Sequence, residues 1–478
     1  MNNKDIHDLI SAKVANRDAA RPEITQRIHK TNKLTARERI DAVLDPDSAV
    51  EYGAIAAQEK QGDWIAEAGG VDFVGTVDTH PVIVSSTDYS DHGGGYGAGR
   101  LGRLFALAYE RRWPLVLFVD GGGSRARHPR AGLGHVELSG PIGRFSFLDG
   151  IPELSGWVPS IAIVSGPSFA GHASIAGFSD FLVSTPGSSI GMGGPPMVEA
   201  ALGQRLSANE LAGSEMHETS GGIDLLVEDE LAAIAAAKRY LSFYHERKIE
   251  PRDPAPGSNL DELAIADQYD MHHVIAALAD RDSTFELRPQ FAQNLITALV
   301  RIDGRSVGVI ANQPLVADGT INHAAATKIS RFVEICNTYD YPMLSLIDSP
   351  GCTAEWQNKK TSDTTEAGLT RWHARPIMAH QQRTVPLLSV QIRRSRGLAS
   401  ALMNGVSTTR GVPMLKLAWP DVEIGLRDGF SAALDHNAFD DVITPSETRA
   451  KLVRMLRLLQ VPEPRVNPHE KKHWIDSW

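Results

Sequence analysis

The stretch GTVDTHPVIVSS, residues 75 to 86, decides the fold, because its pattern returns later in the same chain. It predicts a strand, a tight turn at Asp78 and a second strand, and VRIDGRSVGVIANQ, residues 300 to 313, predicts the same around an Asp-Gly pair. The longer segment from Gly75 to Gly123 recurs from Leu299 to Gly351. Self-similarity of this length indicates an internal duplication.

A helix is predicted after each strand pair, with one apolar stripe facing a core. The stripe is Leu101, Leu104, Phe105 and Ala108 in the first copy, and Ile329, Phe332, Val333 and Cys336, each 228 positions later, in the second. Each helix is followed by an apolar strand, LVLFVD ending at Asp120 and MLSLID ending at Asp348, and then by a glycine-bearing loop. Apolar strands of this kind suit a sheet that is buried on both faces.

A third matched pair is VPSIAIVSGPSFAGHAS from Val158 and VPLLSVQIRRSRGLAS from Val385. Length alone gives a prior of about three domains, but the repeat favours two copies of one α/β domain. The proline-rich segment PRDPAPGSNLDEL suits a linker, so we predict domains at residues 1–255 and 256–478. The first 50 residues, rich in helix formers and charges, are expected to form helical arms outside the core.

The composition is that of a globular protein, with 42% of the 478 residues hydrophobic and 22% charged. A net charge of -10 argues against nucleic acid as a partner. Two cysteines, Cys336 and Cys352, are too few for a disulfide framework or a four-cysteine zinc site. The N-terminus MNNKDIHDLI has no signal-peptide pattern, and no stretch suits a membrane span. We expect a cytoplasmic protein with no membrane partner and no metal.

The loops after the matched strands are candidate oxyanion holes. Glycine lets backbone N–H groups approach a carbonyl oxygen closely, and a helix that begins there adds its positive end. The candidates are GGGSRA, residues 121 to 126, and the turn from Gly397 to Ala399. An ordinary strand-to-helix turn explains any one such loop, whereas the repeat-related positions favour a functional role.

Two motif matches are rejected. The glycines within residues 97 to 102 imitate a dinucleotide-binding fingerprint, but about ten residues separate them from the preceding strand, where the fingerprint needs an immediate turn. Residues 187 to 191 match a serine nucleophile elbow, but the GMGGPP that follows delays any helix to about Pro196.

Several polar side chains are candidates for chemistry. His172 lies in a candidate hole, where it either acts on a substrate or fills space. Glu355 and His373, in and after the loop that begins at Asp348, are possible general acids or bases. The arginines within residues 393 to 396 meet an anionic group or form an ion-paired turn. No HExxH motif or Cys/His cluster indicates a metal site.

Together these residues resemble the carboxyltransferase (beta) subunits of biotin-dependent acyl-CoA carboxylases, of the propionyl-CoA and methylcrotonyl-CoA carboxylase type. KLTARERIDAVLDPDSAVEYG from Lys33 is similar to the N-terminal signature of that family, and GGGSRA to its SGGAR loop. SIGMGGPPMVEAALGQ from Ser189 is similar to GGPPLVKAATGE, and GVIANQPLVADGTI with LIDSPG to the second-domain signature. The resemblance covers nearly the whole chain.

The resemblance implies an α/β protein of two tandem crotonase-like domains. It implies that acyl-CoA binds in the N-terminal domain, where Gly122 and Gly123 match the glycines that hold the thioester enolate. It implies that carboxybiotin reaches the site from the C-terminal domain of a partner protomer, at Gly397, Leu398 and Ala399. The substrate-binding residues that follow from it are Ser124, Arg125, Ala126, Phe169, Ala170, Gly171, His172, Gly193 and Gly194.

The second hole departs from the family pattern. The family reads roughly RKAYGGAYDVM and this chain reads RRSRGLASALM, so Leu398 replaces a glycine and Ala401 an aspartate. His172 likewise stands in GHA where the family usually has GGA. A leucine amide still donates a hydrogen bond, while its side chain takes space that glycine leaves for a biotin ring.

Three functions follow as hypotheses. The first is a carboxyltransferase that forms an acyl-CoA enolate and exchanges a carboxyl group with biotin. Because no ATP-grasp pattern or biotinyl-lysine motif is present, biotin carboxylase and biotin carrier would be separate chains, and the resemblance implies a homo-oligomer, a dimer-based hexamer. The second is a biotin-independent acyl-CoA decarboxylase, hydrolase or C–C lyase of the crotonase superfamily. The third is a non-catalytic acyl-CoA-binding subunit.

Overall fold

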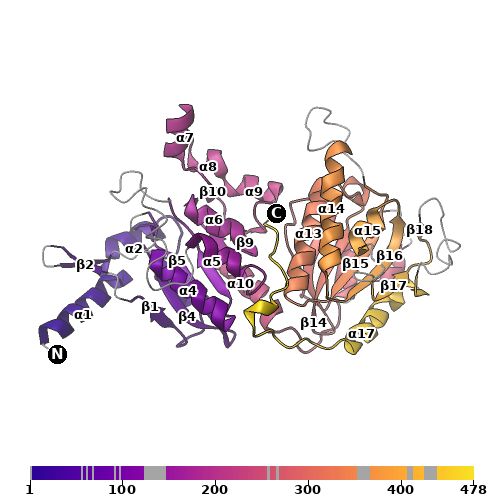
Figure 1. Cartoon of the computed structure of the whole chain (residues 1–478), viewed down its shortest axis with the longest axis horizontal. Coiled ribbons are helices and arrows are strands. Elements are labelled where there is room, and N and C mark those ends of the chain that lie inside the picture. Colours follow the sequence, from indigo (N-terminus) through magenta and orange to yellow (C-terminus); the bar gives the residue numbers. More distant parts are fainter. Residues whose placement is uncertain are drawn as a thin grey trace. The chain divides into compact units, whose positions relative to one another are not determined.

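The computed structural model describes residues 3–54, 57–60, 63–66, 69–90, 93–95, 98–122, 147–255, 259–264, 268–352, 366–405, 413–424 and 439–477. These form two compact units, Met1–Leu241 with Val466–Ser477 and Ser242–Arg465 (Figure 1). The domain boundary near residue 255 stays a prediction; in the structure Ile249 donates to the carbonyl of Gly304 within the second unit.

The first unit is built around one mixed sheet. Its strands, in sheet order, are β1 (Val50–Tyr52), β4 (Gly70–Val77), β5 (His80–Thr87), β6 (Leu115–Phe118), β7 (Ser160–Val164), β9 (Phe181–Ser184) and β11 (Leu225–Leu226). Two small pairs are β2 (Ala57–Lys60) with β3 (Asp63–Ala66) and β8 (Pro167–Phe169) with β10 (Ser189–Gly191). The helices are α1 (Asn3–Ala15), α2 (Pro22–His29), α3 (Ala36–Val43), α4 (Ala98–Arg111), α5 (Phe147–Leu154), α6 (Gly171–Phe178), α7 (Pro195–Leu202), α8 (Ala208–Ala212), α9 (Ser214–Ser220) and α10 (Glu230–His245), whose residues from Ser242 on belong to the second unit.

The second unit repeats this plan. Its sheet order is β12 (Phe285–Glu286), β13 (Leu295–Ile302), β14 (Arg305–Asn312), β15 (Met343–Ser349), β16 (Leu387–Ser395), β17 (Leu415–Ala418) and β19 (Asp441–Val442), with β18 (Glu423–Ile424) beside the end of β16. Its helices are α11 (Leu260–Ala264), α12 (Met271–Leu278), α13 (His323–Thr338), α14 (Glu366–Gln382), α15 (Ala399–Asn404) and α17 (Thr448–Leu458).

The strand pairing confirms the predicted duplication. In the first unit β4 and β5 are antiparallel, and β5, β6, β7, β9 and β11 then run parallel. In the second, β13 and β14 are antiparallel, and β14, β15, β16, β17 and β19 run parallel. The order of strands along the chain and across the sheet is therefore the same in both copies.

Both predicted hairpin turns are present. Asp78 and Thr79 have φ of 49° and 70°, and Asp303 and Gly304 have φ of 54° and 74°. Two consecutive positive φ values are the signature of the turn that best suits twisted antiparallel strands. In the first copy, which lacks the glycine, the Asp45 carboxylate accepts the N–H groups of both turn residues at 3.1 and 2.8 Å.

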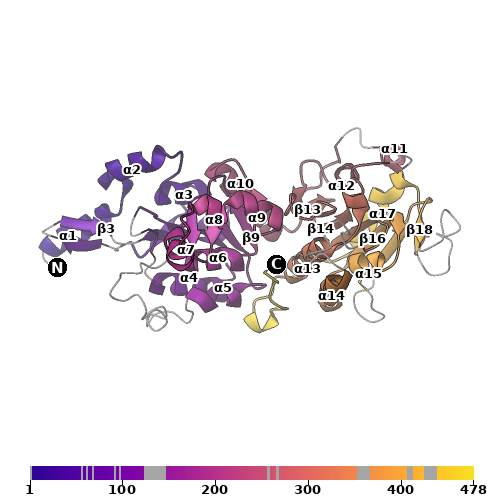
Figure 2. The ribbon, with the colours of Figure 1, turned by 90° about the horizontal axis from the view of Figure 1, so that it is seen from above.

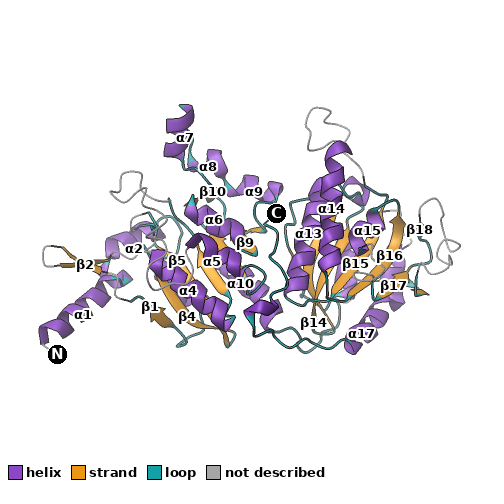
Figure 3. Cartoon of the chain, in the orientation of Figure 1, coloured by secondary structure: helices purple, strands orange, loops and turns teal. Residues whose placement is uncertain are grey.

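Each sheet is covered on both faces, as the apolar strands predict. In the first unit α4, α5 and α6 pack on one face, with the predicted stripe fully buried (Figure 3). The other face is covered by α3 and α10, which Figure 2 shows on the opposite side from α4 and α5. Phe181 of β9 and Tyr240 of α10 stack at 4.9 Å on that other face. The expectation that the first 50 residues lie outside the core is wrong for α3, because Ile40 and Val43 are buried there.

In the second unit α11, α12 and α17 lie on one side of the sheet and α13, α14 and α15 on the other (Figure 2). The predicted α13 stripe is fully buried, and a β-carbon at Gly308 would collide with the Cys336 sulfur, so glycine is required in the facing strand. Over the described ranges, no helix is both long and apolar enough to span a membrane.

Candidate active site

The first glycine loop is joined by backbone hydrogen bonds to the segment that starts α6. Gly121 donates to the carbonyl of Pro167 at 2.6 Å, and Phe169 donates back to the carbonyl of Gly121 at 2.8 Å. Strand β8 therefore pairs with the glycine loop at Gly121, and the chain passes from β8 directly into the N-terminus of α6 at Gly171. These contacts bring the predicted residues from Phe169 to His172 beside Gly121. The first N–H groups of α6 are available there as donors, because they have no acceptor within the helix.

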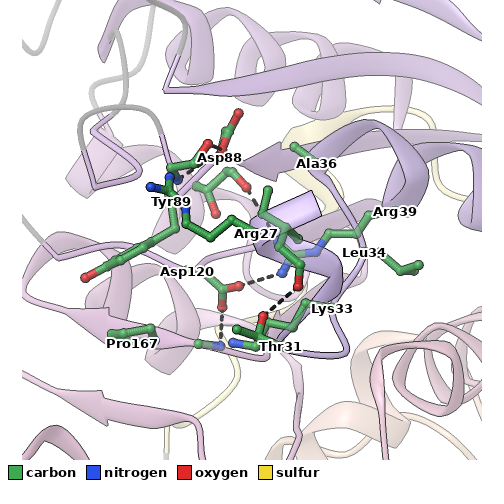
Figure 4. A pocket seen from close by; sticks show the side chains of 14 residues that line it. Arg27, Thr31, Lys33, Leu34, Ala36, Arg39, Asp88, Tyr89, Asp120 and Pro167 are labelled. Atoms are coloured by element: carbon green, nitrogen blue, oxygen red, sulfur yellow. Dashed lines mark hydrogen bonds and ion pairs between the residues drawn. The ribbon is translucent and has the colours of Figure 1, made fainter. Parts of the chain in front are cut away.

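Asp120, the last residue of the predicted strand, anchors this junction. Its carboxylate accepts the backbone N–H groups of Ser165 and Gly166 at 2.9 and 2.8 Å. On its other side it forms a 2.7 Å ion pair with Arg39 of α3, which also pairs with Glu230 of α10. Figure 4 shows Asp120 between the two sets of donors.

The Asp120 carboxyl is kept ionised by its partners. Burial opposes ionisation, but the positive charges of Arg39 and Lys33 outweigh it and hold the pKa of the Asp120 carboxyl below its usual value. A carboxylate with these partners does not accept a proton near neutral pH. Asp120 is therefore a positioning residue for the glycine loop rather than a general base.

His172 lies directly behind Gly121. A β-carbon at position 121 would collide with the imidazole, and Nε2 of the ring lies 2.9 Å from the carbonyl oxygen of Gly94. Burial lowers the pKa of His172, so the ring is neutral at pH 7. The ring thus fills the volume that a side chain at position 121 would take, in agreement with the space-filling interpretation.

The segment Gly93–Gly95 lies against the predicted hole in this conformation, a contact that the sequence did not predict. The N–H of Gly122, predicted to face a thioester oxygen, donates instead to the carbonyl of Gly93 at 2.9 Å. Gly94 has a φ of 76°, and a side chain there would collide with the carbonyl of Asp120. The run of consecutive glycines was the available signal, because only glycine permits so close an approach.

A cavity of about 540 Å³ opens beside this junction. It lies between α2, the start of α3 and the ends of β5 and β6, and it is lined by Arg27, Ile28, Thr31, Lys33, Leu34, Ala36, Arg39, Thr87, Asp88, Tyr89, Ser90, Asp120, Gly166 and Pro167 (Figure 4). Its volume is in the range of small-molecule sites. Besides Arg39, the cavity wall contains the cationic side chains of Arg27 and Lys33. The Nζ of Lys33 donates to the Ser165 carbonyl at 2.5 Å.

Of the remaining predicted site residues of the first unit, two glycines lie in a described turn and four residues lie outside the described ranges. Gly194 precedes α7, and a β-carbon there would lie 3.7 Å from the Phe169 ring, so the GGPP turn borders the start of α6. Gly193 precedes it in the same turn. Gly123, Ser124, Arg125 and Ala126 lie outside the described residues.

The second unit has the corresponding junction. Arg396 donates to the carbonyl of Ser349 at 3.3 Å, which joins the loop after β15 to the turn before α15. Gly397 has a φ of 57° with open space where a side chain would be. Leu398 caps α15 and is 53% exposed, so its side chain extends outward rather than into the core. Ala399 is buried in the first turn.

Asp348 anchors the second junction as Asp120 anchors the first. It is fully buried, and its carboxylate accepts a hydrogen bond of 2.8 Å from the hydroxyl of Tyr269. The carboxylate also forms an ion pair of 2.8 Å with Nε of Arg394. Burial, and then the Asp348 charge, raise the pKa of Tyr269 well above its usual value, so this hydroxyl remains a donor.

The arginine run is an ion-paired turn. Arg394 also pairs with Asp318 at 2.8 Å, Arg396 pairs with Glu423 at 2.5 Å, and Arg393 lies over the ring of Tyr269. These guanidinium groups are thus engaged within the unit.

The two predicted acid/base residues are His373 and Glu355, and the described contacts join neither of them to one of the predicted oxyanion holes. His373 is half-buried on α14, and that helix contacts α15 further along, where His380 lies 3.1 Å from the carbonyl of Leu402. Glu355 lies outside the described residues. Within the described ranges no group of His, Cys, Asp and Glu side chains suits a metal ion, and both cysteines are free thiols.

Two α/β units of one topology, each with a glycine loop anchored at a strand end beside a helix N-terminus, define a duplicated enzyme fold of the crotonase-like class. Comparison with known families narrows this class. The family described as carboxyl transferase domain matches residues 27–434, and the chain belongs to that family. The expected family and two-domain fold are therefore confirmed.

Individual relatives agree with this assignment. The chain is 30% identical to the methylmalonyl-CoA carboxyltransferase 12S subunit of Propionibacterium freudenreichii subsp. shermanii, over 90% of this chain and 89% of that protein. It is 29% identical to the propionyl-CoA carboxylase beta chain of Saccharopolyspora erythraea, over 90% and 88%. A crystal structure of transcarboxylase 12S with methylmalonyl-coenzyme A bound superposes with a TM-score of 0.80 at 27% identity, covering 93% of this chain and 94% of that one.

Proposed function

We propose that this protein is an acyl-CoA carboxyltransferase that stabilises a thioester enolate at the junction of Gly122 and the N-terminus of α6. The observation that carries the proposal is the pair of hydrogen bonds between Gly121 and the Pro167–Phe169 segment, which joins two sets of backbone donors at one place. Preorganised donors of this kind contribute about 3 kcal/mol each to the stability of a developing oxyanion.

The Gly93 carbonyl indicates how a substrate would bind. It already occupies the acceptor position at the N–H of Gly122, with a normal hydrogen-bond length of 2.9 Å. A thioester carbonyl would replace it there and would gain negative charge as the α-carbon loses a carboxyl group or a proton. The loop Gly93–Gly95 must therefore move when the substrate enters.

The cavity next to Asp120 suits the remainder of coenzyme A. Its wall combines apolar surface from Ile28, Leu34 and Pro167 with the cationic side chains of Arg27 and Lys33. An extended pantetheine arm matches the apolar part, and phosphate groups match the cations.

Biotin, when carried to the second unit by another chain, would supply and accept the carboxyl group. The open space at Gly397 leaves room for a ring, and the backbone N–H groups of Gly397 and Leu398 would hold its ureido oxygen. Leu398, half-exposed, would contact that ring with its side chain. The partners proposed are a biotin carboxylase and a biotin carrier as separate chains. The assembly proposed is a dimer-based hexamer, which agrees with the hexamer assembly of transcarboxylase 12S.

Turnover with and without biotin tests this function. Carboxyl transfer predicts that the purified protein decarboxylates malonyl-CoA or methylmalonyl-CoA only when biotin is supplied, with products identified by mass spectrometry. Decarboxylation, hydrolysis or cleavage in the absence of biotin supports the biotin-independent enzyme instead. Thermal stabilisation by CoA esters with no product of any kind supports the non-catalytic subunit.

A matched pair of substitutions tests the site. Gly122→Val places a branched side chain in the predicted hole, where a β-carbon would meet only the Tyr89 hydroxyl at 3.9 Å and the Gly93 carbonyl oxygen at 4.0 Å. It is expected to reduce turnover at least tenfold while the protein stays folded. Gly177→Val, on the exposed side of α6 with nothing within 4 Å, is the control and is expected to leave turnover unchanged. Equal activity of the two variants contradicts the assignment of Gly122.

A further inference from the structure

The segment Gly93–Gly95 is held in the first unit by backbone contacts that only glycine allows. A β-carbon at Gly94 would lie 2.4 Å from the carbonyl oxygen of Asp120, and one at Gly69 would lie 1.9 Å from the carbonyl oxygen of Gly95. Both glycines have positive φ, 76° and 59°. The segment therefore packs directly on the residue before β4 and on the residue that closes the predicted strand at β6.

In this position the segment supplies an acceptor to the predicted oxyanion hole. The carbonyl of Gly93 accepts the N–H of Gly122 at 2.9 Å, although Gly122 itself is exposed. We call this arrangement, with the Gly93 carbonyl on the Gly122 N–H, the closed conformation. In it, the protein fills with its own backbone the place that the proposed function gives to a thioester carbonyl.

His172 binds the next carbonyl of the same segment. Its Nε2 lies 2.9 Å from the Gly94 carbonyl oxygen, and because a carbonyl oxygen only accepts, Nε2 carries the proton and donates. The imidazole is 6% exposed and lies against Gly121, so packing fixes its direction. The ring therefore does more than fill volume, because it joins α6 to the segment that occupies the hole.

The second unit contains a segment held in the same way by a different residue. A β-carbon at Gly319 would lie 2.6 Å from the Asp348 carbonyl oxygen, as one at Gly94 would lie against Asp120. The Gly319 carbonyl accepts the side-chain amide of Asn312 at 3.2 Å. A side-chain donor to this backbone carbonyl thus occurs in both copies, and in the first copy the donor belongs to the helix that borders the hole.

We propose that His172 is a positioning residue that stabilises the closed conformation and so limits the entry of acyl-CoA at Gly122. The thioester carbonyl competes with the Gly93 carbonyl for one N–H group. A contact that favours the closed conformation therefore lowers the apparent affinity for the substrate. The bond from His172 is such a contact, because Gly93 and Gly94 are consecutive and must leave the hole together. The inference rests on the proposed function for its substrate, but the closed conformation is measured without one.

Two variants of similar shape isolate the hydrogen bond. His172→Gln keeps a side-chain N–H donor near the position of Nε2, whereas His172→Met has a similar length and no donor. Both lose the imidazole ring, so the loss of packing is common to the two and only the donor differs. Melting curves establish that each variant is folded. If His172→Met does not fold, His172→Leu takes its place as the variant without a donor.

Hydrogen exchange at the Gly122 amide measures the closed conformation without a ligand. Deuterium uptake of the full chain is followed by mass spectrometry, with fragmentation that resolves single residues. Exchange requires that this amide leaves the Gly93 carbonyl. It is expected to be about 3- to 10-fold faster in His172→Met than in His172→Gln, the effect of one neutral hydrogen bond. The amide of Val119, bonded to Ile163 at 3.0 Å, is the internal control and is expected to exchange equally in both.

Isothermal titration calorimetry with propionyl-CoA measures the consequence for binding, because this thioester has no carboxyl group to lose. His172→Met is expected to bind it about 3- to 10-fold more tightly than His172→Gln. A merely structural role of His172 predicts equal or weaker binding by His172→Met, since the loss of a packing contact does not improve affinity.

Equal exchange of the Gly122 amide in the two variants overturns the proposal, and so does equal or weaker binding of propionyl-CoA by His172→Met. If propionyl-CoA binds neither to the unmodified protein nor to any variant, the proposed function is overturned. The exchange rates then still decide whether His172 stabilises the closed conformation, so the two proposals fail separately.

Discussion

At the scale of the residue, two departures from the family signature compensate each other. Gly121 stands where SGGAR has a serine, and His172 stands where the family usually has a glycine. The structure shows that the imidazole occupies the volume next to Gly121 that a side chain at that position would need. Each departure alone is unexplained by the sequence, because the two positions are 51 residues apart.

Gly121→Ala is therefore expected to destabilise the protein by about 1–3 kcal/mol, since its methyl group overlaps a ring that is fixed by packing. The free energy of unfolding in urea measures this. Gly122→Ala is the control, with a change within about 0.5 kcal/mol, because a methyl there meets nothing closer than the Tyr89 hydroxyl at 3.9 Å. Combining Gly121→Ser with His172→Gly is expected to recover most of the loss, and additive losses in that double variant contradict the pairing.

At the scale of the element, buried charges join helices to strand ends. Arg39 connects α3 to Asp120 after β6 and to Glu230 at the start of α10, and its guanidinium lies 5.2 Å from the centre of the Phe118 ring. The sequence predicted the strand and its terminal aspartate. It offered no reason to choose Arg39 as the partner, because that contact spans 81 positions and depends on where α3 packs.

Arg39→Met is expected to cost about 3–5 kcal/mol, because it leaves two buried carboxylates without their cation. Arg457→Met, which removes an exposed pair with Asp303, is the control and is expected to change the free energy of unfolding far less, because solvent screens that pair. Because the folded-state pKa of Asp120 is lowered, its contribution to stability is present above its unfolded pKa near 4 and is lost as pH falls through the folded value. Urea unfolding at pH 7 and at pH values from about 4 down to about 2 measures both effects. A cost that does not fall across this acidic interval contradicts the ionised pair.

The start of α12 gives a dependence on pH of opposite sign. His272 lies 2.7 Å from Asp270 and 2.9 Å from Glu286, and its hydrogen bond to Glu286, followed by that to Asp270, raises its pKa to about 9 against the burial that opposes it. The charged form is favoured in the folded state. Its contribution is therefore complete below pH 6.5, the ordinary value, and is lost as pH rises to about 9.

His272→Gln is expected to remove this dependence. Since the imidazole is 45% exposed, solvent screens the pair, and the loss at pH 6 is expected to be at most about 1 kcal/mol. Urea midpoints of the two proteins are expected to differ at pH 6 and to converge by about pH 10. A difference that persists at high pH would show a packing role instead.

At the scale of the whole molecule, the chain returns to the first unit at its end. Lys471 donates to the carbonyl of Glu153 at 3.1 Å, Ile475 donates to the Ser155 hydroxyl at 3.1 Å, and the Ile475 side chain is buried. No repeat or motif predicted this, because residues 466–477 have no counterpart in the duplicated pattern.

Ending the chain after Arg465 is expected to lower the melting temperature of the first unit only. Differential scanning calorimetry of the full and shortened proteins measures this, with one transition shifted by several degrees and the other unchanged, since 1 kcal/mol corresponds to about 2–4 °C for units of this size. A matched Ile475→Ala variant is expected to show part of the same shift. If the truncation shifts both transitions equally, the segment does not belong to the first unit alone.

The sequence by itself determined the duplicated α/β plan, the hairpin turns, the buried helix stripes and the family, because each depends on local patterns that occur twice or on motifs read in order. Only the tertiary structure decided which groups meet: Arg39 with Asp120, His172 with Gly121, and Gly122 with Gly93. The physical reason is that periodicity records which face of an element is buried. It does not record the partner, which depends on contacts between residues that are far apart in the chain.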